Sequence, residues 1–67
     1  MKRGHQLGER VRRLREDYGL TQSAVAREWG RPQPNLSRIE NGWVGVSDDQ
    51  FDAIVGAILR AQRRSGS

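Results

Sequence analysis

The fold of this chain is decided by residues 21–42, which read TQSAVAREWGRPQPNLSRIENG. Thr21 is a good N-cap residue, and Val25 and Trp29 follow at the spacing of one helix face. Gly30 then ends this short helix, because glycine readily takes the left-handed conformation that redirects a chain. The first part of the stretch therefore predicts a helix of about two turns.

A second short helix is expected to start near Pro32 or Gln33. Proline lacks a backbone N–H, so it is excluded from a helix interior but tolerated at the cap and in the first turn. Leu36 and Ile39 supply the apolar face of this helix, and Gly42 ends it. Two short helices joined by a glycine-containing turn predict a helix-turn-helix motif.

The motif spans about residues 21–41, and a longer helix is predicted on each side of it. Before the motif, Leu7, Val11 and Leu14 recur at helical spacing, and Gly19 supplies the stop. After it, Ser47 and the glutamine three residues later form a capping-box pattern. The apolar stripe of this last helix consists of Phe51, Ile54, Val55, Ile58 and Leu59.

These elements predict an all-α fold, a compact bundle of four or five short helices. We expect a single domain over residues 1–67 with an ordered core of about 5–62. A chain of 67 residues has too little interior for a walled catalytic cavity, so an enzyme is not expected. The absence of cysteine excludes disulfides and thiolate metal sites.

The net charge and the length of the apolar runs indicate what the protein can bind and where in the cell it is expected. Twelve basic and eight acidic side chains give a net charge of +4, which permits nucleic-acid binding without proving it. The longest apolar run, residues 53–59, is far shorter than a membrane span, and no secretory signal follows the basic first residues. We therefore expect a cytoplasmic protein that is associated with the nucleoid.

The sequence resembles the Cro and phage-repressor family of helix-turn-helix proteins, also called XRE-like, from about Leu7 to Leu59. The resemblance is carried by Leu14-Arg15, Gly19-Leu20-Thr21-Gln22, Val25-Ala26, Gly30 and Leu36-Ser37-Arg38-Ile39-Glu40-Asn41-Gly42. It implies a lambda-repressor-like fold and a sequence-specific regulator of transcription, in the simplest case a repressor that binds a palindromic operator in double-stranded DNA as a homodimer. It implies no cofactor, and we expect no small-molecule effector.

In such a protein the third helix lies in the major groove, and the residues near its start contact base edges. By position these residues are Gln33, Pro34, Ser37 and Arg38. Gln33 can pair with adenine and Arg38 with guanine, whereas Pro34 offers only apolar contact to a thymine methyl group.

Contacts to the DNA backbone are expected from residues around this helix. By resemblance, Gln22 contacts a phosphate and braces Gln33. The full set of backbone candidates is Gln22, Asn35, Asn41, Arg10, Arg27, Arg31 and Trp43. Arg12, Arg13 and the arginines at 60–64 are interpreted as a solvated face and tail.

Two further groups of residues are given structural roles. The resemblance implies an ion pair between Arg15 and Glu40 that joins the first and third helices. The wide apolar stripe of the last helix predicts a dimer interface, with Phe51, Ala53, Val55, Gly56 and Leu59 as its candidates.

Two alternative functions stay open at this point. The chain could be a protein-interaction adaptor or an antitoxin-type partner protein that keeps the fold with little DNA readout, which Pro34 and the uncharged Trp43 loop would suit. It could also coat nucleic acid through charge alone, although its basic residues are not concentrated in one run.

Overall fold

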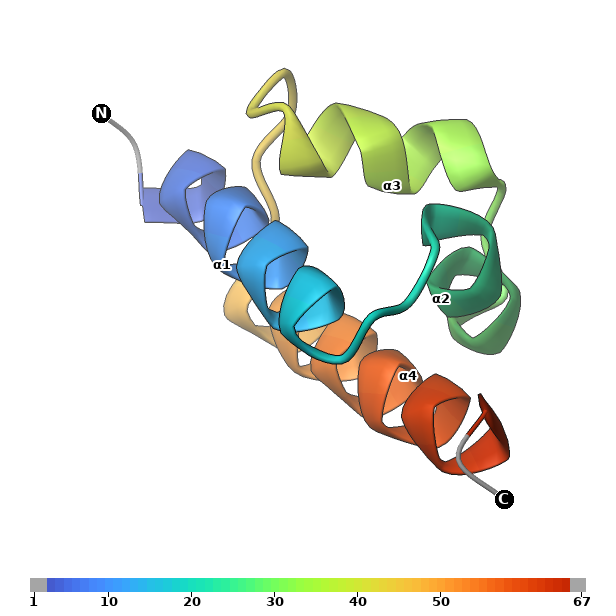
Figure 1. The fold of residues 1–67 in the computed structure, drawn as a ribbon. Coiled ribbons are helices and arrows are strands. Elements are labelled where there is room, and N and C mark those ends of the chain that lie inside the picture. Colours follow the sequence, from blue (N-terminus) through green and yellow to red (C-terminus); the bar gives the residue numbers. More distant parts are fainter. Residues whose placement is uncertain (1–2, 66–67) are drawn as a thin grey trace.

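The computed structural model describes residues 3–65, and within them the chain forms four helices and no strand. These helices are α1 (Arg3–Asp17), α2 (Gln22–Trp29), α3 (Gln33–Glu40) and α4 (Asp48–Ser65). In Figure 1, α3 lies at the top and α4 at the bottom, and both pack on α1 and α2. The all-α prediction is confirmed. None of the four helices is long and apolar enough to cross a membrane.

Both outer helices extend beyond the ordered core expected from the sequence. The first helix begins at Arg3, and the last continues to Ser65. A fifth helix is absent from the described residues. The predicted capping box fixes the start of the last helix: Ser47 Oγ accepts the Gln50 N–H at 3.1 Å, and Gln50 Oε1 accepts the Ser47 N–H at 3.1 Å.

The two short helices begin and end where the turn chemistry predicts. Thr21 Oγ1 accepts the N–H of Ala24 at 3.1 Å, which satisfies one free donor at the start of α2. Gly30 takes the left-handed conformation with φ of +82° and turns the chain toward α3. Pro32 at the N-cap of α3 makes no side-chain hydrogen bond. Its ring restricts the backbone angle φ at this position, but the side chain supplies no acceptor for the free N–H groups at the start of α3.

One small core holds the four helices together. Each helix contributes at least one side chain that is fully buried, and the largest of these are Val11, Val25, Leu36, Ile54 and Ile58. Trp29 and Phe51 are half-buried and pack against this core, which confirms the interpretation of both as core residues. Because α3 is anchored by Leu36 and Ile39 on one face, its opposite face remains at the surface.

A glycine permits α1 and α3 to approach closely. Gly8 is buried in α1, and a Cβ added to it would lie 1.9 Å from the carbonyl oxygen of Ile39. That carbonyl also accepts the N–H of Gly42 at 3.1 Å, so it belongs to the last turn of α3. The close packing of α3 on α1 therefore requires a glycine at residue 8, because any side chain there would overlap α3.

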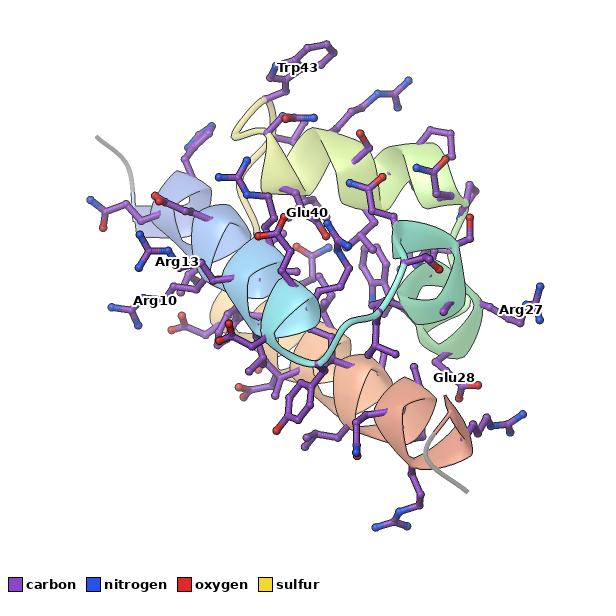
Figure 2. All side chains as sticks on the ribbon, viewed as in Figure 1. Arg10, Arg13, Arg27, Glu28, Glu40 and Trp43 are labelled. Atoms are coloured by element: carbon purple, nitrogen blue, oxygen red, sulfur yellow. The ribbon has the colours of Figure 1, made fainter. Side chains whose placement is uncertain are left out.

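The solvated tail predicted at residues 60–64 needs a correction, because two of its arginines bind α2. Arg60 Nη2 donates to the carbonyl oxygen of Glu28 at 3.1 Å, and Arg64 Nε lies 3.0 Å from Glu28 Oε2. The Glu28 side chain is only 12% exposed. A carboxylate near the C-terminus of a helix opposes the helix dipole, and the two guanidinium groups compensate for it. Figure 2 shows Glu28 at the α4 side of α2.

Candidate nucleic-acid interface

A buried ion pair connects α1 to the end of α3. Arg15 donates from Nε to Glu40 Oε2 and from Nη2 to Glu40 Oε1, both at 2.8 Å, and from Nη1 to the carbonyl oxygen of Leu20 at 2.7 Å. The two charged side chains are 12% and 1% exposed. The hydrogen bonds that Arg15 donates to Glu40 raise the pKa of Arg15, so the guanidinium is charged throughout the neutral range.

Gln22, the first residue of α2, extends this pair toward the surface. Its Nε2 donates to Glu40 Oε1 at 2.9 Å, and its Oε1 accepts from Gln33 Nε2 at 2.5 Å. Because ionised Glu40 can only accept, the amide group of Gln22 has one satisfactory orientation, with its oxygen toward Gln33. The chain of contacts from Arg15 through Glu40 and Gln22 thus ends at an exposed side chain of α3.

The geometry leaves Gln33 with a donor and an acceptor side by side. One N–H of its Nε2 is used by Gln22, so the second N–H and the oxygen Oε1 remain free for another partner. Adenine presents the complementary pair in the major groove, an acceptor at N7 and a donor at N6. Gln33 therefore keeps the donor and the acceptor that the contact predicted from the sequence needs.

The other base-contact candidates lie on the same helix. Pro34 and Arg38 are exposed and Ser37 is half-buried. Asn41 Nδ2 donates to the Ser37 carbonyl oxygen at 2.9 Å and lies 3.3 Å from Ser37 Oγ. The side chain of Asn41 therefore caps the end of α3, while the Ser37 hydroxyl can still donate its own hydrogen.

The loop after α3 is held in place at its start. Gly42 has φ of +77°, its N–H donates to the Ile39 carbonyl oxygen, and the Trp43 N–H donates to that of Arg38 at 2.9 Å. This is the Schellman arrangement, which fixes the direction in which the chain leaves a helix. The indole of Trp43 is 74% exposed and, in Figure 2, projects away from the protein beyond the end of α3. Trp43 is thus a large amphipathic side chain on a rigid turn beside α3.

The arginine candidates for backbone contacts do not all lie near α3. Arg31 follows α2, lies over the ring of Trp29 at 5.6 Å from its centroid, and lines an open hollow together with Asn35 and Arg38. Figure 2 shows Arg27 on the outer side of α2 and Arg10 on the outer side of α1, both directed away from α3. The structure therefore brings Arg31 and Asn35 to the α3 surface, but not Arg10 or Arg27.

The dimer-interface candidates are divided between the core and the surface of α4. Phe51 is half-buried against the core, Val55 and Gly56 are half-buried, and Ala53 and Leu59 are exposed. α4 packs on α1 and α2, and in Figure 1 it lies at the bottom of the molecule, with α3 at the top.

Two features of the site were missed by the sequence analysis. The hydrogen bond from Gln22 to Glu40 was not expected, although a glutamine able to brace another residue also needs a fixed orientation of its own. The contact of Gly8 with α3 was also missed, because a glycine in a helix pattern carries no signal for its partner helix.

Comparison with known families matches a family model described as a helix-turn-helix domain to residues 6–65. The match includes both short helices, the turn between them and most of the two flanking helices. No curated protein and no solved structure matches the chain with statistical support.

Proposed function

Because this chain belongs to the helix-turn-helix domain family, we propose that it is a transcriptional regulator that binds double-stranded DNA sequence-specifically with α3 in the major groove. The observation that carries the proposal is the network from Arg15 to Gln33. It fixes an amide group at the exposed start of α3, where a recognition helix contacts bases.

In the proposed complex, Gln33 contacts adenine through N6 and N7, and Arg38 contacts guanine through O6 and N7. Ser37 contributes a hydroxyl and Pro34 an apolar surface to the same groove. Each good bidentate contact discriminates against the wrong base by about 1–3 kcal/mol. Sequence preference therefore rests on two side chains of α3.

Around α3, polar groups on both sides bind the DNA backbone. The backbone N–H groups at the start of α2, next to Gln22, suit a phosphate because helix N-termini attract anions. On the other side, Arg31, Asn35 and Trp43 contact the sugar-phosphate chain, and Asn41 orients the end of α3. Such contacts position the protein without selecting a sequence.

The simplest regulatory mechanism is repression by occupancy of an operator in the cytoplasm. Two copies on a palindromic site would place their α3 helices one DNA turn apart, about 34 Å. The α4 residues Phe51, Ala53, Val55, Gly56 and Leu59 remain the proposed contact between the two copies, and of these Ala53 and Leu59 are exposed.

Selection from random-sequence duplexes at two salt concentrations tests the proposal. We expect an enriched palindrome, and the Arg38→Ala variant should lose the preference for one base pair in each half-site. Arg31→Ala should instead weaken binding to all sequences and lower the log-log salt slope by about 0.9. Binding without any enriched sequence would indicate coating through charge, and no binding at low salt would favour the adaptor function.

A further inference from the structure

The open hollow beside α3 has an apolar lining. We call it the α3 hollow; it has a volume of about 220 Å³ and lies between the end of α2, α3, the loop after α3 and the start of α4. Ile39 and Val46 in its lining are buried, Trp29 is half-buried, and Val44 is exposed. Pockets for drug-sized ligands measure about 300–1,000 Å³, so the α3 hollow suits a smaller molecule with a single ring.

The polar groups that line the α3 hollow offer hydrogen-bond donors and no negative charge. Neither Arg31 nor Arg38 forms an ion pair within the described part of the chain. The half-buried Asn35 makes no side-chain hydrogen bond there, and Gln50 uses only its Oε1, in the capping box. Two other hollows of the described surface are lined by Glu9 and so carry a carboxylate. The α3 hollow therefore favours an anionic acceptor.

Arg31 places a positive charge next to the apolar lining. Its guanidinium carbon lies 5.6 Å from the centroid of the Trp29 ring, a distance at which the ring attracts the cation. This contact restricts the long side chain of Arg31, so less freedom is lost when the guanidinium binds an acceptor. A charged donor and an apolar surface are thus available to the same ligand.

We propose that the α3 hollow is a binding site for a small organic anion, a carboxylate that carries one ring, although no effector was expected from the sequence. The ring packs against the apolar lining around Trp29. The carboxylate accepts charge-assisted hydrogen bonds from Arg31 and Arg38 and a further one from Asn35.

The bound anion competes with DNA, a consequence that rests on the proposed function. In that function Arg38 contacts guanine, while Arg31 and Asn35 contact the DNA backbone. A donor that is occupied by the carboxylate cannot serve a base or a phosphate at the same time. Because the anion binds only the DNA-free form, it shifts the protein away from its operator and acts as an inducer.

Titration of the free protein with benzoate, followed by nuclear magnetic resonance, tests the site without DNA. We expect the signals of the Trp29 indole N–H and of the Asn35 and Gln50 side-chain amides to shift and to saturate in the millimolar range, as suits so small a ligand. Benzamide has the ring without the charge, and acetate has the charge without the ring. Each should bind about tenfold more weakly than benzoate.

Arg31→Gln should weaken benzoate binding about tenfold and keep the helical fold, since Arg31 is exposed. Arg27→Gln is the matched control, because Arg27 is an exposed arginine that is directed away from α3 in Figure 2. This control should bind benzoate like wild type.

Inorganic phosphate distinguishes a site for organic anions from a subsite for the DNA backbone. Because phosphate has no ring, we expect it to shift the same signals only at concentrations about tenfold higher than benzoate. Phosphate that binds as tightly as benzoate, equal losses in Arg31→Gln and Arg27→Gln, or no shift in the α3 hollow would overturn the site.

Competition for a duplex that the protein selects tests the consequence separately. Sodium benzoate should weaken DNA binding more than sodium chloride at the same ionic strength. Val44→Ser removes apolar lining but no proposed DNA contact, so it should bind the duplex normally and need about threefold more benzoate for release. Equal effects of the two salts would refute the competition. If no duplex binds at all, the proposed function fails, whereas the titration result stands by itself.

Discussion

The Glu40→Ala variant is expected to lose about 3–5 kcal/mol of unfolding free energy, because it leaves the charge of Arg15 buried without a partner. The loss extends beyond one contact, since Gln22 also loses its acceptor. For a domain of this size we expect the melting temperature to fall by more than about 10 °C. Thermal unfolding followed by circular dichroism measures this directly.

Glu9→Ala is the matched control for this prediction. Glu9 also forms an ion pair, with Arg13 at 3.7 Å, but these two side chains are 58% and 76% exposed. Exposed pairs contribute little, so the melting temperature should barely change. The combined Arg15→Ala and Glu40→Ala variant should lose less than the sum of the two single changes. An unchanged melting temperature in Glu40→Ala would refute the structural role of the pair.

The second large effect is expected from Gly8→Ala. In an exposed helix, alanine is more favourable than glycine by up to about 1 kcal/mol, but here the new methyl group would overlap the Ile39 carbonyl oxygen. This backbone atom cannot move without breaking the end of α3. We expect a net destabilisation of about 1–3 kcal/mol, together with weaker DNA binding, because α3 must shift away from α1.

Gly56→Ala provides the matched comparison, since it makes the same change in another helix. Its methyl group would meet only the end of Arg60, which can adjust. We expect Gly56→Ala to raise the melting temperature by a few degrees when measured on dilute, monomeric protein, while Gly8→Ala lowers it. Similar melting temperatures for the two variants would show that α1 and α3 do not depend on the glycine.

Features that depend on neighbouring residues could be predicted from the sequence. The Thr21 cap, the left-handed Gly30 and the pair of bonds between Ser47 and Gln50 each involve residues at most three apart. Local chemistry decides such features, so a short stretch of sequence is sufficient to identify them. The helix-turn-helix followed from these signals together with the apolar spacing.

Contacts between residues far apart in the sequence could be identified only from the family resemblance or from the structure. The Arg15–Glu40 pair spans 25 residues and was implied by resemblance, not by spacing. The contacts of Glu28 with two arginines of α4 were missed, because the sequence does not indicate which charged residues of two separate helices will meet. Which α4 residues stay exposed was also decided only by packing, which divides the candidates for the dimer interface between the core and the surface.

The central claim is that the network ending at Gln33 presents this side chain to adenine in the major groove. It is tested most directly by replacing each adenine of the selected duplex, one at a time, with 7-deazaadenine, which lacks the N7 acceptor. We predict one position in each half-site where wild type loses about fivefold in affinity, equivalent to about one hydrogen bond, and where Gln33→Ala loses nothing. Wild type that tolerates every replacement, or a Gln33→Ala variant that is equally sensitive, would contradict the claim.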